Sequence, residues 1–264
     1  MRICLVGAGR VATQLGPALL RAGHTVSCVW SRTAASAAAL AARLPGAHAT
    51  TTTLDLRHLK EVEVMLLAVP DAAVEPLLAQ LQVPTDVLVA HTAGALPLAV
   101  FAPYPHLHGG VFYPLQTFSP GRAVEWATLP LCIEAADAAS QATLLALAHS
   151  LSQDVRLLDS GQRLLLHTAA VFAGNFTNHV LGISHALLHE AGLPFELVTP
   201  LVRETVEKAF AYPPFTVQTG PAVRHDAPTL ARHQAALHAH PVWQQVYAAV
   251  SRSIQEQAVR PPAG

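Results

Sequence analysis

A glycine-rich turn at the start of the chain most constrains its fold. An apolar run over 2–6 leads directly into the motif Gly-Ala-Gly-Arg-Val-Ala over 7–12, and apolar residues then recur at helical spacing as far as Ala22. A strand, a glycine turn and a helix in this order match the dinucleotide-binding pattern G-x-G-x-x-G/A. The alternative is an ordinary turn of an α/β protein, but the flanking strand and helix favour a bound dinucleotide.

Each residue type in this turn has a physical role. A first glycine permits the tight turn, a second lets a pyrophosphate approach the backbone, and a small third residue lets the helix pack close to the strand. The helix N-terminus then offers free N–H groups to the phosphates. The residues of the turn that we expect to contact a cofactor are Gly7, Gly9, Arg10, Val11 and Ala12.

The end of the second expected strand, 25–30, indicates which dinucleotide binds. NAD-binding proteins usually carry an acid there, which accepts hydrogen bonds from the ribose 2′-OH. This chain carries Ser31 and Arg32 instead. A hydroxyl and a guanidinium suit a phosphate dianion, so we expect NADP(H) as the cofactor. The alternative is that Arg32 is a solvated residue at a helix start.

The first half of the chain alternates between strand and helix patterns. Further strands are expected over 47–49, 62–69, 86–90, 129–134 and 155–158, and helices to about residue 43 and over 72–81 and 138–151; 101–120 looks loop-rich. This alternation predicts a doubly wound α/β Rossmann domain over residues 1–158. The strand-end residues that should lie beside the ribose and nicotinamide are Val69, Pro70, Thr92, Ala93 and Gly94.

From Gly161 onward the pattern is helical throughout. Helices are expected over 162–191, 195–211, 227–239 and 241–258, with Gly192 and Pro194 ending the first. We therefore expect a second, all-α domain over 159–264 that binds substrate and dimerises. The long apolar first helix needs more cover than one small domain offers, so a homodimer through this domain is expected.

Composition narrows the classes of partner. The 264 residues carry a net charge of −1 without a basic block, which argues against nucleic acid. No uninterrupted apolar stretch reaches about 18 residues, so no membrane span is expected. The three cysteines lie in apolar runs, which indicates reduced thiols and a cytoplasmic protein.

Several motifs line up with the opening turn: Leu-Ala-Val-Pro-Asp at 67–71, His-Thr-Ala-Gly-Ala at 91–95, Pro-Leu-Gln-Thr-Phe at 114–118, Ala-Gly-Asn-Phe-Thr-Asn at 173–178 and Thr-Gly-Pro-x-x-Arg-x-Asp at 219–226. Together they resemble poorly characterised Rossmann-like NADP-binding oxidoreductases related to pyrroline-5-carboxylate reductase and deazaflavin-dependent NADP reductase. The resemblance implies an NADP-binding N-terminal domain, a helical domain that commonly dimerises, and reductase activity. The family usually has histidine where this chain has Tyr113. Tyr113 either supplies a different acid or only packs.

Hydride transfer needs a proton donor and an anchor for the substrate. His91 at a strand end and His167 on the first long helix are acid candidates, and each can equally be a packed core histidine. Asn175 and Asn178, one turn apart, are mid-helix asparagines, which are intrinsically unfavourable and indicate a polar task or a bond to neighbouring backbone. Arg224 is a candidate for holding a substrate carboxylate or phosphate.

Other site types find little support. The histidine pairs 185/189 and 106/108 lack a third ligand at a recognisable spacing, so no metal is expected. Serine-hydrolase and P-loop motifs are absent. The sequence therefore favours an NADP(H)-dependent oxidoreductase that reduces a small C=O or C=N substrate. The alternatives are an NADP(H)-binding or sensing protein without turnover and, less favoured, a deazaflavin-linked NADP reductase.

Overall fold

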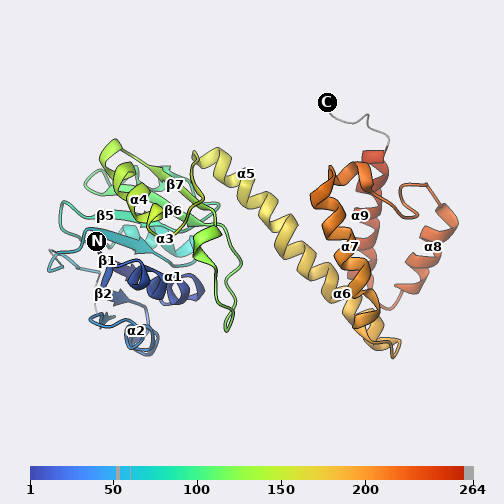
Figure 1. Ribbon diagram of the computed structural model, residues 1–264, viewed down its shortest axis with the longest axis horizontal. Helices are drawn as coiled ribbons and strands as arrows, with labels where there is room; N and C mark the ends of the chain where they lie inside the picture. The colour runs from blue at the N-terminus through green and yellow to red at the C-terminus, as the bar shows by residue number, and fades with distance from the viewer. Residues whose placement is uncertain (52–53, 60, 259–264) are drawn as a thin grey trace. The chain divides into compact units, whose positions relative to one another are not determined.

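The computed structural model describes residues 1–51, 54–59 and 61–258, and the first half follows the expected alternation (Figure 1). Its strands are β1 (Arg2–Val6), β2 (Thr25–Trp30), β3 (His48–Thr50), β4 (Val64–Leu67), β5 (Leu88–His91), β6 (His108–Pro114), β7 (Leu131–Ala135) and β8 (Val155–Leu157). Its α-helices are α1 (Arg10–Arg21), α2 (Ala34–Ala41), α3 (Asp71–Leu78) and α4 (Ala138–His149), and the short 3-10 helix η1 (Leu98–Phe101) follows β5.

The strands form one sheet in the order β3-β2-β1-β4-β5-β6-β7-β8. Neighbouring strands are parallel except β6 and β7, which pair antiparallel. The strand order reverses next to β1, which is the feature of a doubly wound fold that creates a ligand crevice at the carboxyl edge. The expected fold class, a Rossmann domain followed by a helical region, is confirmed.

One expectation about the first half is wrong. The segment expected to be loop-rich contains β6, which pairs with both β5 and β7. Its glycines weaken the strand pattern, but they make room for packing: a Cβ on Gly109 would lie 2.5 Å from Phe101, and one on Gly110 would lie 2.6 Å from Leu144. These glycines of β6 therefore serve close packing, and the sequence of the strand lacks the usual strand pattern.

The two faces of the sheet carry separate apolar cores. Along β1, Ile3 and Leu5 join the cluster that includes α1 and α4, whereas Cys4 and Val6 join the cluster that includes α3 and Phe101. This alternation follows from the two-residue period of a strand. Burial on both faces explains why β4 is apolar throughout and why β1 is apolar after the exposed Arg2 at its start.

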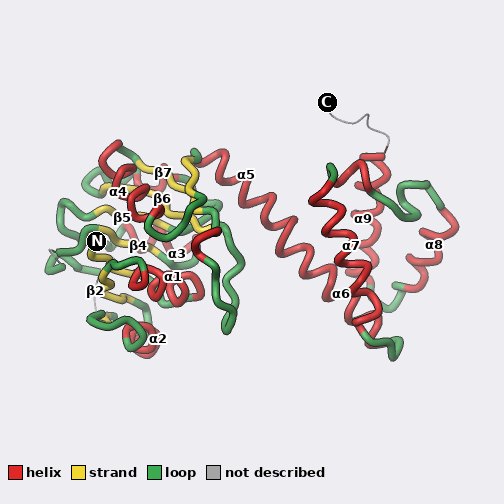
Figure 2. The backbone as a smooth tube through the Cα atoms, in the orientation of Figure 1, coloured by secondary structure: helices red, strands yellow, loops and turns green. Residues whose placement is uncertain are grey.

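The second half is helical, as expected, but its first helix is not a single α-helix. α5 (Ser160–Ala170) passes through a π-helical stretch (Val171–Phe176) into α6 (Thr177–Glu190). The wider π turn places side chains at different angles from α-helical ones, so face assignments across it made from sequence do not hold. The later helices are α7 (Thr199–Ala211), α8 (Ala227–Ala236) and α9 (Pro241–Ala258), and Figure 2 shows the change from strands to helices.

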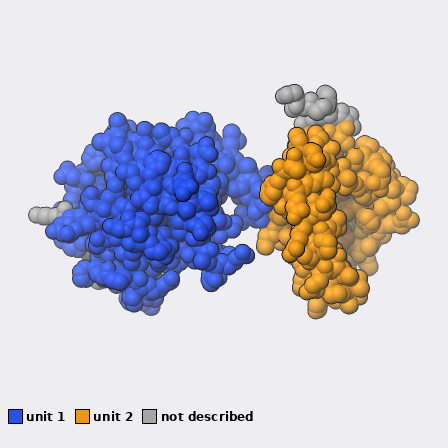
Figure 3. Space-filling view, in the orientation of Figure 1, with its two compact units in different colours: residues 1–175 blue, residues 176–264 orange. Residues whose placement is uncertain are grey.

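The chain divides into two compact units, Met1–Asn175 and Phe176–Gly264 (Figure 3). The border falls inside the π-helical stretch. Most large buried apolar side chains belong to the first unit, and the described part of the second exposes many of its own. None of the described helices is long and apolar enough to span a membrane.

Candidate functional site

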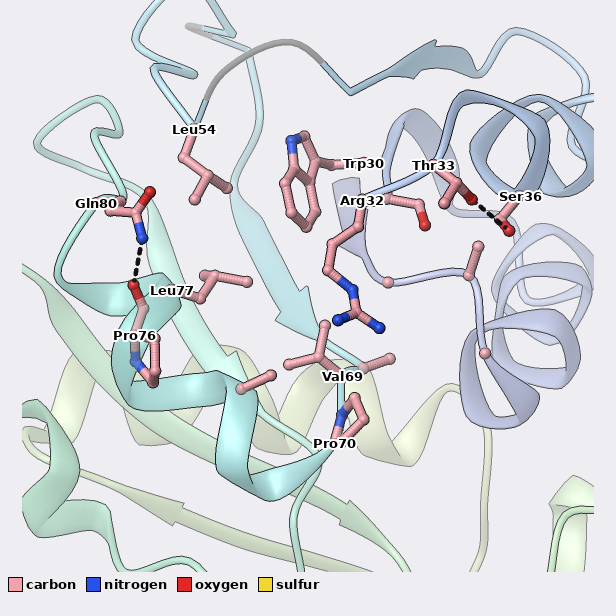
Figure 4. Close-up of a pocket in the computed structure, with 16 residues that line it drawn as sticks. Trp30, Arg32, Thr33, Ser36, Leu54, Val69, Pro70, Pro76, Leu77 and Gln80 are labelled. Carbon is pink, nitrogen blue, oxygen red and sulfur yellow. Dashed lines mark hydrogen bonds between the residues drawn. The ribbon is translucent and has the colours of Figure 1, made fainter.

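A cavity of about 740 Å³ opens at the carboxyl edge of the sheet in the first unit (Figure 4). This volume is within the range of small-molecule and cofactor sites. The expected cofactor residues that line it are Gly7, Gly9, Ser31, Arg32, Val69 and Pro70. The remaining lining residues are Ala8, Trp30, Thr33, Ser36, Leu54, Ala68, Ala73, Pro76, Leu77 and Gln80.

The two glycines of the turn are glycine for different reasons. Gly7 has φ +113°, and a Cβ there would lie 2.3 Å from the carbonyl oxygen of Ala68, so the turn itself requires glycine. Gly9 has φ −84°, and a Cβ there would meet nothing closer than that oxygen at 4.0 Å. None of the described residues therefore demands glycine at Gly9. A Cβ would instead fill space at the cavity wall.

The start of α1 is prepared for an anion. Gly9 is the N-cap and has no side chain to satisfy the first N–H groups, and the first turn carries no acidic residue. Free N–H groups and the positive end of the helix dipole favour a phosphate group there. Arg10 and Val11 lie on this first turn and Ala12 is fully buried under it, which allows the close packing that the motif predicts.

Arg32 supplies the charge of the cavity. Figure 4 shows its guanidinium pointing into the cavity, toward Val69 and Pro70. Among the described residues of the lining, Arg32 is the sole charged one and none is a carboxylate. The end of β2 therefore offers a guanidinium to an anionic ligand and lacks the acid that a ribose 2′-OH would need.

The opposite wall of the cavity was not predicted from sequence. Ala73, Leu77 and Gln80 recur at helical spacing along and just beyond α3, and Trp30 and Leu54 add apolar surface. The i, i+4, i+7 spacing was visible in the sequence as one face of a helix. Only the fold shows that this face lies across from the glycine turn.

The segment after β5 is buried at the same edge of the sheet. The backbone N–H and the hydroxyl of Thr92 both donate to the carbonyl oxygen of Leu67, each at 3.2 Å. Thr92, Ala93 and Gly94 do not belong to the lining of the 740 Å³ cavity. They directly follow β5, the strand beside β4. The two strands end at the same level, because Leu67 pairs with His91.

His91 is a packed residue. Its side chain is fully buried, its ring stacks on Phe101 with centroids 6.0 Å apart, and its Nδ1 accepts the N–H of Ala93 at 3.2 Å. Burial, with the nearby charge of Arg163, lowers the pKa of His91 to about 3. A neutral ring that holds the turn after β5 corresponds to the core-histidine alternative rather than to an acid.

The structure brings together two other candidates that the sequence treats separately. The hydroxyl of Tyr113 at the end of β6 lies 2.9 Å from Nδ1 of His167 on α5. A Cβ on Gly94 would lie 2.4 Å from that Nδ1 and 2.9 Å from Cζ of Tyr113. Gly94 is therefore glycine because the two rings occupy the space of a side chain.

A buried ion pair anchors α5, and sequence analysis missed it. Arg163 is ion-paired with Glu134 on β7, and its guanidinium also donates to the carbonyl oxygen of Leu96 at 2.5 Å. The hydroxyl of Ser160 donates to Glu134 at 2.9 Å. An arginine one turn before a histidine in a helix is a visible pattern, but its acidic partner lies on a distant strand.

The remaining candidates lie at the end of the first unit or in the second unit. Asn175 is the last residue of the first unit and Asn178 belongs to the second, and both are exposed. Arg224 is exposed before α8, where Asp226 caps the helix by accepting the N–H of Thr229 at 3.1 Å. Of the two lysines, Lys60 lies outside the described residues and Lys208 lies on α7. Within the described ranges, no three His, Cys, Asp or Glu side chains are arranged to hold a metal ion.

The fold and the glycine turn define the Rossmann class of α/β proteins, and residues 1–115 match the family described as a Rossmann-like domain. Residues 129–254 match a domain of unknown function, DUF2520. The chain belongs to the family of the putative NADP oxidoreductase from Bacteroides fragilis: the two are 39% identical, over 97% of this chain and 98% of that one, with a TM-score of 0.84.

More distant structures share the fold. A protein from Thermotoga maritima is 20% identical, over 98% of this chain and 100% of that one, with a TM-score of 0.75. A reductive aminase from Aspergillus terreus, solved with NADPH and ethyl levulinate, is 21% identical, over 97% of this chain and 94% of that one, with a TM-score of 0.70. No curated protein matches the chain.

Proposed function

We propose that the protein is an NADP(H)-dependent oxidoreductase that reduces a small C=O or C=N substrate. The observation that carries the proposal is the 740 Å³ cavity, in which the guanidinium of Arg32 is the only charged group among the described lining residues. The name of the Bacteroides fragilis relative points to the same cofactor. When bound, the cofactor supplies a hydride.

Distinct parts of the lining fit distinct parts of NADP(H). The start of α1 and the open space at Gly9 suit the pyrophosphate. Ser31 and Arg32 suit the 2′-phosphate, and the apolar wall at Trp30 and Leu77 suits the adenine. Val69 and Pro70 line the cavity just beyond the end of β4. The nicotinamide end of the cofactor would then lie toward the segment after β5.

The test compares the two dinucleotides. We expect the wild-type protein to bind NADPH more tightly than NADH in isothermal titration calorimetry. Loss of NADPH absorbance should follow on addition of one member of a panel that includes a five-membered cyclic imine carboxylate and a small keto acid. The cyclic imine enters the panel because of the resemblance to pyrroline-5-carboxylate reductase. Equal affinities for NADPH and NADH would contradict the assignment of the 2′-phosphate.

Two other functions would produce different results in the same test. A sensing or carrier protein would bind NADPH but oxidise it with no member of the panel. A deazaflavin-linked NADP reductase would oxidise it only with a deazaflavin. The part-buried Tyr113–His167 pair favours an enzyme, because a dinucleotide carrier has no need for a proton-transferring pair at the edge of the sheet.

We also propose that the helical unit forms a homodimer in the cytoplasm. Apolar side chains of this unit are strongly exposed, including Leu201 at 65%, Phe210 at 87% and Phe215 at 73%. Such surface is typical of an interface between subunits. The three buried free cysteines fit a reducing compartment. Light scattering at increasing salt should give twice the chain mass; a monomer mass would contradict the dimer.

A further inference from the structure

The pair formed by Tyr113 and His167 lies on separate elements of the first unit. The phenol oxygen and Nδ1 are 2.9 Å apart, and the two rings meet edge to face with centroids 5.8 Å apart and planes at 77°. Tyr113 is only 7% exposed, while His167 is half-buried. We infer that His167 is the proton donor of the proposed reduction and that Tyr113 is the residue that positions it. This inference rests on the proposed oxidoreductase function.

The direction of the hydrogen bond follows from the surroundings of Tyr113. Burial, with the negative charge of Asp71 and the thiol of Cys132, raises the pKa of Tyr113 to about 12, although Arg163 opposes the rise. The phenol therefore keeps its proton at neutral pH, and whenever the imidazole of His167 carries no charge its Nδ1 accepts that hydrogen. The neutral ring then carries its own hydrogen on Nε2, and protonation of the ring reverses the hydrogen bond, with Nδ1 donating to the phenol oxygen.

Several contacts fix the position of the imidazole of His167. Gly94 leaves just enough room for both rings, because a Cβ there would collide with each of them. One turn before His167, the buried Arg163 fastens α5 to Glu134 and to the carbonyl oxygen of Leu96. A proton-transferring group needs neighbours that fix its position in this way, because small displacements reduce its efficiency.

The chemistry balances with one proton from this pair. The substrate carbon gains a hydride with its two electrons, the C=O or C=N π bond breaks, and the oxygen or nitrogen takes a proton from Nε2 of the imidazolium form of His167. The hydride source is oxidised, and His167 is left neutral with its remaining hydrogen on Nδ1, which still donates to the phenol oxygen of Tyr113. A proton from the solvent then returns to Nε2. No other co-reactant is needed.

The experiment compares His167→Gln and Tyr113→Phe with the wild type and with His149→Gln, which removes an exposed histidine at the end of α4. On the panel member that the wild type reduces, we expect His167→Gln to lower kcat by about 100-fold or more and to abolish the fall of the rate at high pH. Tyr113→Phe should lower kcat by about 2- to 10-fold and shift the midpoint of that fall. NADPH affinity should stay within about 2-fold in all three variants.

A second readout does not depend on turnover. In ¹⁵N spectra of the imidazole groups, neutral His167 of the wild type should be the Nε2–H tautomer, and Tyr113→Phe should mix the two tautomers. A wild-type kcat and pH profile in His167→Gln, or an Nδ1–H tautomer in the wild type, overturns the proposal while the NADP(H) function stands. Failure of the wild-type protein to bind NADPH overturns both.

Discussion

Arg163 and Glu134 form an ion pair inside the first unit, where the arginine side chain is 1% exposed and the glutamate 16%. Glu134 also accepts from the backbone N–H and the hydroxyl of Ser160. These bonds join the first turn of α5 to β7. The ion pair therefore helps to fix the position of His167, which lies one turn further along the same helix.

Removing one partner of this pair should be costly. Arg163→Ala leaves the carboxylate of Glu134 buried without its charge partner, so we expect the free energy of unfolding to fall by about 3–5 kcal/mol. The control is Arg156→Ala, which breaks an exposed pair with Asp154 and should leave the free energy of unfolding close to the wild-type value. Urea unfolding curves give both values. Similar losses in the two variants would contradict a structural role for the buried pair.

Arg32 should decide between the two dinucleotides. Arg32→Ala removes the one charged group that the described residues contribute to the cavity lining. We expect NADPH affinity to fall by roughly 10- to 100-fold, as for the loss of a charge-assisted hydrogen bond, with little change for NADH. Arg43→Ala, an exposed arginine just beyond α2 and outside the lining, is the matched control. Parallel losses for NADPH and NADH would indicate damage to the fold instead.

The two glycines of the turn should respond differently to the same substitution. Gly7→Ala places a Cβ 2.3 Å from the carbonyl oxygen of Ala68 at a positive φ, which should cost at least about 1–3 kcal/mol of stability. Gly9→Ala meets no such contact and should cost less than about 1 kcal/mol. Titration calorimetry should nevertheless show that Gly9→Ala loses most of its NADPH affinity. Undiminished binding by Gly9→Ala would place the pyrophosphate elsewhere.

His91 should make stability fall in acid. The pKa of His91 is lowered to about 3 in the folded protein, against about 6.5 in an unfolded chain. The unfolded state thus binds one proton more between these values, and the free energy of unfolding decreases by up to about 1.4 kcal/mol per pH unit as pH drops from 6.5 toward 3. Urea unfolding at a series of pH values should give a free energy of unfolding that depends less steeply on pH for His91→Gln than for the wild type. An unchanged dependence on pH would show that other groups cause the acid sensitivity.

Local patterns predicted much of the first unit. The apolar runs of β1 and β4, the turn at Gly7 and the positive residue Arg32 all depend on neighbours within a few residues, so sequence alone predicted them. β6 was missed because its signal is spread over Gly109 and Gly110, whose purpose appears only when Phe101 and Leu144 pack against them. The π-helical stretch was missed because the apolar helical pattern continues on both sides of Gly174 and Asn175, so the local sequence does not show the wider turn.

The sequence by itself determined the Rossmann class, the helical second half and the residues that face the cavity from the glycine turn and the end of β2. Those properties follow from the period of apolar residues and from the backbone freedom of glycine, both of which are local. Only the tertiary structure decided that Tyr113 meets His167 and that Arg163 meets Glu134, because each pair joins a helix to a strand through long-range packing. It also separated buried His91 from half-buried His167, two histidines that look alike in the sequence.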